Sequence, residues 1–210
     1  MLKQNKKHTP DNNALLEALV VKAIKGDRQA LSDLCDKIAK GVLFQVAHLL
    51  GSNASIEDIA QEVLIRVCEN IHKLRDPKTF KGWLAKIVVN EKNRFLSKHI
   101  KHNDVLNIND YLENVTESEG AVIPHKYIEN EEIKKAVMEV VSGLPMRQKE
   151  VILLHYYSGL SVKEVAATMN ITTQSVSKQL SIAREKLKNK LSVCSSFDGY
   201  SDVFKQTNFK

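Results

Sequence analysis

Apolar residues at steps of three and four are the feature of this chain that most constrains its fold. One such stripe starts at Leu31 and ends at Leu49, and another starts at Val176 and ends at Leu187. Residues at these steps share one face of an α-helix, because the helix has 3.6 residues per turn. Alternation with a period of two, the pattern of a half-buried strand, is not sustained anywhere in the sequence. The pattern predicts an all-α protein.

The first half of the chain is expected to form a small helical bundle. A short helix around residues 14–25 is broken at Gly26 and precedes the helix of the Leu31 stripe. Residues 55–58 read Ser-Ile-Glu-Asp, the form of a capping box, and predict the start of another helix. That helix should end near Asp76-Pro77, because the residue before a proline disfavours helical backbone. A further helix is expected from about Phe80.

Acidic residues are concentrated between the two halves of the chain. Over residues 102–133, eight acidic residues stand against a single lysine, a net charge of −7, although the whole chain carries +6. The early part of this stretch is rich in Asn, Asp and Ser without a helical period, which is typical of a linker. We therefore predict two small helical domains joined by a flexible acidic linker. The expected boundaries are a domain at 11–101, the linker at 102–128, a domain at 129–191 and a tail at 192–210.

A basic segment closes the first domain. Residues 78–101 contain seven Lys and Arg side chains and one Glu. Asn90 and Asn93 lie among the cations, so this helix could neutralise phosphates and offer amides to base edges. A solvated lysine-rich face is the alternative. Phe80 and Trp83 could stack on exposed bases, but their helical spacing favours packing in the core.

The helix before the basic segment carries a polar and acidic face opposite its apolar stripe, formed by Asp58, Gln61, Glu62 and Glu69. Such a face suits a basic or mixed protein partner, because complementary charge steers the encounter and fixes its register. An ordinary solvated helix face has the same composition. Both interpretations stay open at this point.

The second domain contains the pattern of a helix-turn-helix. Ser161-Val162-Lys163-Glu164 has the form of a second capping box, and Thr172 is the expected N-cap of the helix that follows a three-residue turn. A short helix, a tight turn and a second helix with a polar exposed face are typical of the motif that places its second helix in the DNA major groove. A helical hairpin with a solvated face is the alternative. The outward residues of the second helix are hydrogen-bonding or cationic: Thr173, Gln174, Ser177, Lys178, Ser181, Arg184 and Lys188.

Six sequence motifs resemble, in order and spacing, those of the bacterial sigma-70 RNA polymerase initiation factors of the short extracytoplasmic-function type. In the first domain they read G-D-R-Q-A-L, S-I-E-D-I-A-Q-E-V-L-I-R-V and F-K-G-W-L-A-K-I-V-V-N. In the second they read L-P-M-R-Q-K-E-V-I-L-L-H-Y, G-L-S-V-K-E-V-A and S-V-S-K-Q-L-S-I-A-R-E-K-L. The resemblance implies a region 2-like domain, a region 4-like domain and no enzyme activity or cofactor. The implied function is to direct RNA polymerase core to promoters and to assist promoter opening.

The resemblance also implies partners and residue roles. The implied partners are the β′ clamp of RNA polymerase core, promoter DNA and an anti-sigma factor. Binding to core polymerase is implied for Asp58, Gln61 and Glu62. Capture of flipped bases of the −10 element is expected of Lys78, Thr79, Lys81, Lys86, Asn90, Asn93 and Arg94. Recognition of the −35 element is expected of Thr173, Gln174, Ser177, Lys178, Ser181 and Arg184.

Composition excludes several other classes of protein. No apolar run approaches the ~20 residues that a membrane span requires, so no membrane insertion is expected. Residues 1–10 are polar and lack the apolar core of a secretory signal. Cys35, Cys68 and Cys194 are too few and too widely spaced for a disulfide framework or a metal knuckle. The expected location is the cytoplasm, and no metal is expected.

The sequence leaves two alternative functions and suggests one mode of regulation. A conventional helix-turn-helix regulator that binds duplex DNA without core polymerase would leave the acidic face and the basic segment unexplained. A metal-dependent hydrolase using His99, His102 and Asp104 is disfavoured, because no second carboxylate-rich helix supports these residues. The charge distribution further suggests that the −7 stretch folds back on the remainder of the chain, which carries +13, and suppresses promoter binding.

Overall fold

The computed structural model describes residues 12–51, 55–99 and 131–191, and within these ranges it consists of helices joined by short connections. The first unit contains α1 (Asn12–Ile24), α2 (Arg28–Leu50), α3 (Ile56–Asn70) and α4 (Phe80–His99), with the 3₁₀ turns η1 (Ile71–Lys73) and η2 (Pro77–Thr79) before α4. The second contains α6 (Glu131–Ser142), α7 (Met146–Ile152), the π-helical turn η3 (Leu153–Tyr157), α8 (Val162–Met169) and α9 (Thr173–Leu191). No strand occurs in the described ranges, so the predicted all-α class is confirmed.

Local side-chain chemistry explains where the helices of the first unit begin. The backbone turns at Gly26, whose φ of +90° suits a residue without a Cβ atom. Asp27 then caps α2 by accepting a hydrogen bond from the Ala30 N–H at 3.0 Å. The capping box predicted at residues 55–58 is wrong in one respect, because the Ser55 side chain makes no capping hydrogen bond although Ser55 does precede α3.

The predicted caps of the helix-turn-helix are confirmed. The Ser161 side chain accepts from the Glu164 N–H, and the Glu164 carboxylate accepts from the Ser161 N–H at 2.7 Å, which completes the capping box of α8. Asn170 ends α8 in the left-handed conformation with φ of +54°. Thr172 then caps α9 by accepting from the Ser175 N–H at 3.1 Å. Together these contacts fix the tight turn between α8 and α9.

Each unit buries the apolar stripe that its sequence predicts. In the first unit, α2, α3 and α4 meet through side chains that are fully excluded from water, including Leu34, Val63 and Val88. Phe80 is buried and Trp83 is partly buried against the same core, as their spacing predicts. In the second unit the fully buried residues of α9 are Val176, Leu180, Ala183 and Leu187. Burying one such Val or Leu side chain contributes about 1.5–3 kcal/mol to folding.

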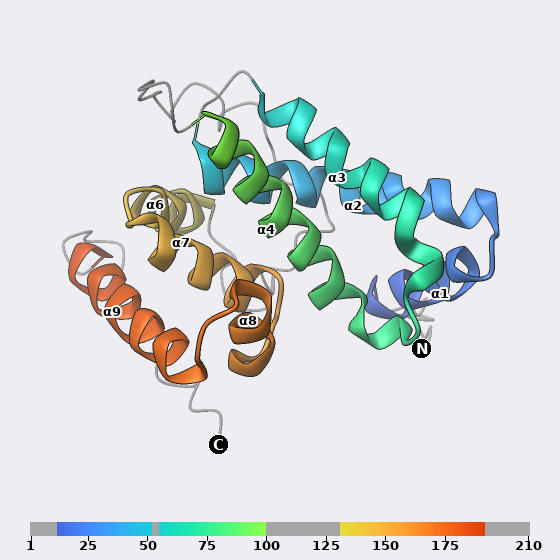
Figure 1. Ribbon diagram of the computed structural model, residues 1–210. Coiled ribbons are helices and arrows are strands. Elements are labelled where there is room, and N and C mark those ends of the chain that lie inside the picture. Colours follow the sequence, from blue (N-terminus) through green and yellow to red (C-terminus); the bar gives the residue numbers. More distant parts are fainter. Residues whose placement is uncertain (1–11, 52–54, 100–130, 192–210) are drawn as a thin grey trace, which may run out of the picture.

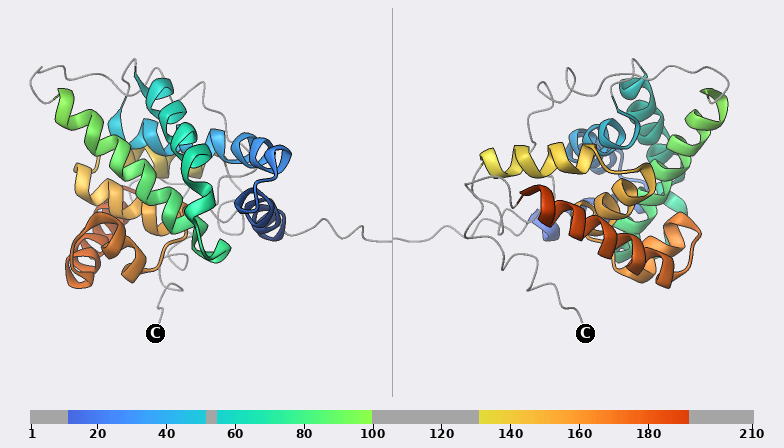
Figure 2. Two further views of the ribbon diagram at one scale, coloured as in Figure 1. Left: turned by 45° about the vertical axis from the view of Figure 1, so that its right-hand side comes forward. Right: turned by 90° about the vertical axis from the view of Figure 1, so that its left-hand side faces the viewer.

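The two units pack against each other along α4. Figure 1 shows α4 with α3 on one side and α8 on the other, and the turned views of Figure 2 agree with this order. Phe44 of α2 stacks on Tyr157 of η3 with ring centroids 4.6 Å apart. The Ser158 hydroxyl donates to Gln45 Oε1 at 3.3 Å. The domains therefore share a packed interface in this conformation.

This interface also contains a buried ion pair. Lys92 Nζ of α4 lies 2.6 Å from Glu150 Oε1 of α7, and the two side chains are only 4% and 6% exposed. The exact domain boundaries stay a prediction, and the acidic linker and the tail lie outside the described residues, as do His102 and Asp104. Among the helices that are described, none combines the length and the apolar character needed to cross a bilayer.

Candidate nucleic-acid and protein interfaces

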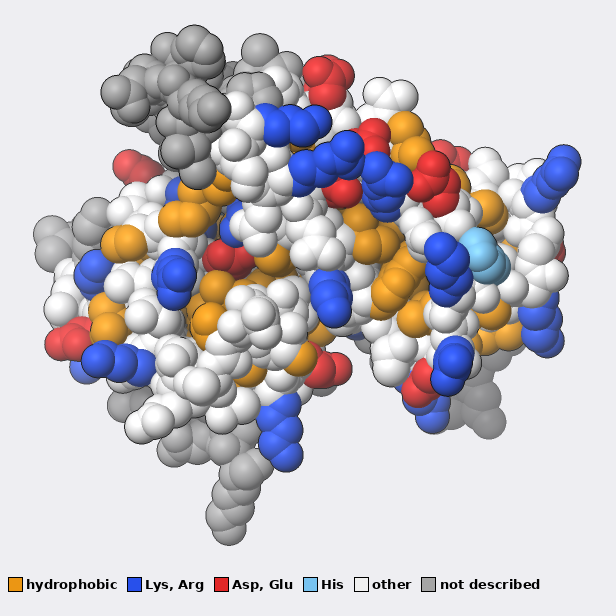
Figure 3. All heavy atoms as spheres, in the orientation of Figure 1, with side chains coloured by type: hydrophobic (Ala, Val, Ile, Leu, Met, Phe, Trp, Pro, Cys, Tyr) orange, Lys and Arg blue, Asp and Glu red, His pale blue; other side chains and the backbone are white. Residues whose placement is uncertain are grey.

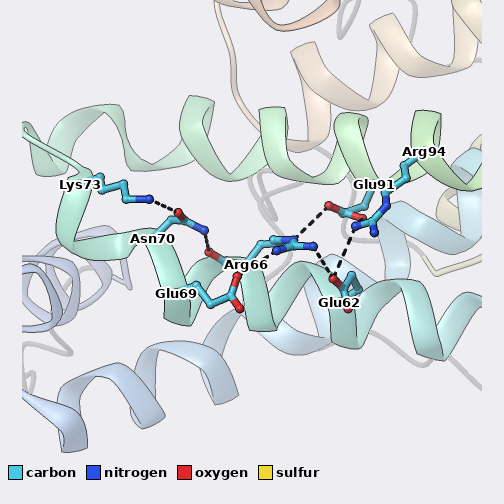
Figure 4. A network of polar contacts seen from close by, with 7 residues as sticks. All are labelled: Glu62, Arg66, Glu69, Asn70, Lys73, Glu91 and Arg94. Atoms are coloured by element: carbon cyan, nitrogen blue, oxygen red, sulfur yellow. Dashed lines mark hydrogen bonds and ion pairs between the residues drawn. The ribbon is translucent and has the colours of Figure 1, made fainter.

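Part of the predicted docking face on α3, at Glu62 and Glu69, belongs to a network of mixed charge. Glu62 pairs with Arg66 at 2.9 Å, and Arg66 also reaches Glu69 at 3.0 Å and Glu91 of α4 at 3.5 Å (Figure 4). Hydrogen bonding to Glu69 and the charge of Glu62 raise the pKa of the Arg66 guanidinium above its ordinary value. The network is open to solvent, so its contribution to stability is small, and its main effect is to hold these side chains in place.

Two of the predicted docking residues stay outside this network. Asp58 and Gln61 are exposed on α3, whereas Glu62 is half-buried between Arg66 and Arg94, the latter at 3.8 Å. Ile65 is 42% exposed on the same helix, four residues after Gln61, and the sequence interpretation missed it. An apolar side chain between polar ones at helical spacing is the signal that could have identified it. Outside the network, the face thus offers the Asp58 carboxylate, the Gln61 amide and the apolar Ile65 side chain to a partner.

The residues predicted for the −10 element divide into three groups. Lys86, Asn90 and Asn93 are exposed and share one face of α4, because they are spaced by four and three residues. Lys78 and Thr79 are exposed on η2, where Asp76 accepts from the Lys78 N–H at 2.9 Å and the Thr79 hydroxyl donates to the Asp76 carbonyl at 2.7 Å.

The third group contains cations that the structure directs elsewhere. Lys81 donates to Asn13 Oδ1 of α1 at 3.1 Å, and Arg94 lies 3.5 Å from Glu91. Lys92, which contributes to the charge of the basic segment, is buried against the second unit. Figure 3 shows Lys and Arg side chains next to Asp and Glu side chains on the upper part of the first unit. The basic segment therefore presents fewer unpaired charges than its composition suggests.

The predicted reading surface of α9 is exposed in one continuous patch. Thr173, Gln174, Ser177, Lys178 and Ser181 all face solvent, while the opposite face of α9 is buried against α7 and α8. This patch starts at the first turn of the helix, the part that reaches base edges in helix-turn-helix proteins.

Arg184 differs from its predicted outward position. Its Nε donates to the Tyr156 hydroxyl at 2.7 Å, and its guanidinium carbon lies 5.7 Å from the centroid of that ring. The side chain is half-buried because it covers η3. The role of Arg184 at the −35 element stays a prediction, and a contact with DNA would require the guanidinium to reach past Tyr156.

Comparison with known proteins matches both helical units to one family. Residues 34–101 match the family model described as Sigma-70 region 2, and residues 134–187 match the one described as Sigma-70, region 4. The chain is 27% identical to the ECF RNA polymerase sigma factor SigW of Bacillus subtilis, over 84% of this chain and 98% of that protein. It is 26% identical to the ECF RNA polymerase sigma-E factor of Escherichia coli, over 83% and 93%. It also matches the probable sigma factor RfaY of Xanthomonas campestris at 27% identity, spanning 46% of that longer protein.

Solved structures show the same fold. The sigma factor RpoE of Bartonella quintana, in complex with the anti-sigma factor NepR, matches with a TM-score of 0.57 and 21% identity over 78% of this chain and 97% of that one. CnrH, in complex with the cytosolic domain of CnrY, matches with a TM-score of 0.54 and 19% identity over 86% and 99%. These findings do not support the conventional regulator. The chain belongs to the sigma-70 family of RNA polymerase sigma factors, as a member of the extracytoplasmic-function type.

Proposed function

We propose that the chain directs RNA polymerase core to promoters by contacting two separate DNA elements, one with each helical unit, and that it is no enzyme itself. The observation that carries this proposal is the exposure of two polar helix faces on different units, Lys86–Asn90–Asn93 on α4 and Thr173–Ser181 on α9. A protein with two such faces can recognise two DNA segments at once. An anti-sigma factor belongs to the proposal as a partner, since the Bartonella quintana sigma factor of the same fold forms a complex with one.

The α3 face is proposed to bind core polymerase. Asp58 and Gln61 are exposed and precede the exposed Ile65 at helical spacing, so this face of α3 can offer a carboxylate and an amide beside an apolar anchor. Glu62 contributes less directly, because Arg66 already neutralises much of its charge at 2.9 Å. Asp58 is therefore the residue on which the electrostatic part of core binding depends most.

Reversing the charge of Asp58 is expected to weaken core binding. Asp58→Arg should raise the Kd for core polymerase roughly 30-fold, since it replaces an attractive contact with a repulsive one worth about 2 kcal/mol. The measurement is a fluorescence titration of labelled protein with purified core enzyme. Glu139→Arg, an equal charge change at an exposed position of α6, is the matched control and should bind like the unaltered protein. Equal affinities for all three proteins would contradict the assignment of α3.

The α4 face is proposed to capture unpaired bases of the −10 element. Two amides at Asn90 and Asn93 can pair with base edges while Lys86 neutralises the backbone. Flipping a base out of the stack costs a few kcal/mol, and these contacts offset that cost. Lys78 and Thr79 on η2 would bind the same strand before it reaches α4.

The α9 patch is proposed to read the −35 element, and Gln174 and Lys178 are expected to differ in how they do so. Gln174→Ala should weaken binding by about 1–3 kcal/mol on the cognate sequence and relax the preference at one base pair. Lys178→Ala should weaken binding to all sequences alike and lower the salt slope of log K by about 0.9. Promoter competition by the holoenzyme across a salt series distinguishes the two effects. Lys22→Ala, on exposed α1, is the control; a sequence preference unchanged in Gln174→Ala would reject this role.

A further inference from the structure

Two thiols meet at the surface between α2 and α3. Cys35 Sγ lies 3.4 Å from Cys68 Sγ, within hydrogen-bonding distance for sulfur. Both cysteines are free, Cys35 half-buried and Cys68 exposed. They are 33 residues apart in the sequence, so the packing of α2 on α3 brings them together.

We propose that Cys35 and Cys68 are a redox modification site that closes to a reversible disulfide on reaction with a low-molecular-weight disulfide such as oxidised glutathione. A disulfide bond is about 2.05 Å long, so the two sulfurs must approach by about 1.4 Å. The side-chain torsion of an exposed cysteine on a helix can supply much of this movement. Exposed disulfides of this kind have the higher reduction potentials that make them labile and regulatory rather than structural.

The exchange takes place in two balanced steps. The Cys68 thiolate, having lost its proton to solvent, attacks one sulfur of the small disulfide, forms a mixed disulfide and releases one small thiolate. Cys35 then loses its proton and attacks Cys68 Sγ, which forms the protein disulfide and releases the second small thiolate. The two protein thiols are oxidised by two electrons, and the small disulfide is reduced to two thiols.

The different surroundings of the two thiols indicate which of them reacts first. Burial, followed by the hydrogen bond with Cys68, raises the pKa of the Cys35 thiol to about 12, so almost none of it is thiolate near neutral pH. Cys68 is exposed and can be reached by a small disulfide. Once Cys68 is part of a mixed disulfide, its sulfur carries no charge, and Cys35 lies beside it as the resolving thiol.

The position of the pair links it to the docking face. Cys68 follows Gln61 by seven residues, so both lie on nearly the same face of α3, and it directly precedes Glu69 of the Arg66 network. A disulfide here would fix α3 against α2 beside the surface proposed to bind core polymerase. This consequence rests on the proposed function, whereas formation of the disulfide does not.

The test equilibrates the full-length Cys194→Ser protein in glutathione buffers of increasing oxidised fraction, followed by acid quenching, alkylation and intact-mass analysis. The expected product is a monomer lighter by two hydrogens, with a proteolytic fragment that joins the Cys35 and Cys68 peptides, and a reductant restores both thiols. Thiols that stay reduced in oxidised glutathione alone would overturn the proposal. So would a stable glutathione adduct on Cys68 while Cys35 is present.

Single-cysteine variants test the order of attack without requiring activity. Cys35→Ser should accumulate the mixed disulfide at Cys68, because the resolving thiol is missing. Cys68→Ser should lose its remaining thiol at least about tenfold more slowly, because Cys35 is half-buried and burial, the largest cause of its raised pKa, persists without Cys68. Circular dichroism verifies that both variants are folded. Faster reaction at Cys35 than at Cys68 in these variants would contradict the mechanism, and a core-binding titration of the oxidised protein then tests the functional consequence separately.

Discussion

Replacing Lys92 with methionine is expected to separate the two helical units. The substitution removes the positive partner of Glu150 and leaves a side chain that is only 6% exposed without that partner. Breaking a buried ion pair at one end costs about 3–5 kcal/mol, because the remaining charge is uncompensated. Opening the interface returns Glu150 to water and avoids that cost. The closed-to-open equilibrium should therefore shift toward the open form by roughly 100- to 5,000-fold.

Small-angle scattering and fluorescence energy transfer between labels at positions 22 and 188 measure this opening. Lys92→Met should show a larger radius of gyration and weaker transfer than the unaltered protein, in a background whose native cysteines are replaced by serine. The double variant Lys92→Met/Glu150→Leu is the decisive control, because it removes both charges and can refill the space with apolar atoms, so it should close again. An identical scattering profile for Lys92→Met and the unaltered protein would show that the ion pair does not hold the units together.

Local features of the fold are largely predictable from this sequence, and contacts between distant residues are not. The helices follow from apolar spacing, and the caps at Ser161 and Thr172 follow from chemistry within three residues. Ser55 shows the limit of such motifs, because a matching pattern precedes α3 without its capping hydrogen bond. Sequence composition also does not say which cations form ion pairs. On α3, Arg66 pairs with Glu62 and Glu69, two of the carboxylates that made this face look acidic in the sequence.

The sequence contains part of the information needed to predict the contact of Lys92 with the second unit. It follows Ala85 and Val89 at helical spacing, and both of these are buried. A lysine in line with an apolar stripe indicates a buried or interfacial position better than a DNA-facing one. Its partner Glu150 is 58 residues away in the sequence. No sequence pattern indicates how the two units pack, so this pairing is known only from the structure.

The closed arrangement has a geometric consequence for promoter binding. α4 packs on α8, and α8 packs on α9, so a single helix separates the two proposed DNA-reading helices. Packed helices lie 8–10 Å apart, which places α9 about 20 Å from α4. The −10 and −35 elements are about 25 base pairs apart by their names, or about 85 Å at ~3.4 Å per base pair. If α4 and α9 read the −10 and −35 elements as proposed, the closed form cannot hold both elements, and we expect transcription to require the interface to open.

Locking the interface should abolish transcription from promoters that need both elements. A Cβ atom at Gly82 of α4 would lie 3.8 Å from Leu160 Cδ2, next to α8, so Gly82→Cys and Leu160→Cys place two thiols across the interface. A short bis-methanethiosulfonate can bridge them in a background free of the native cysteines. Run-off transcription with core enzyme should fall at least about 100-fold, because the two contacts can no longer form together. Dithiothreitol cuts the bridge and should restore activity, and each single-cysteine protein treated in the same way controls for modification alone. Full activity of the bridged protein would mean that the chain reads both elements without separating its domains.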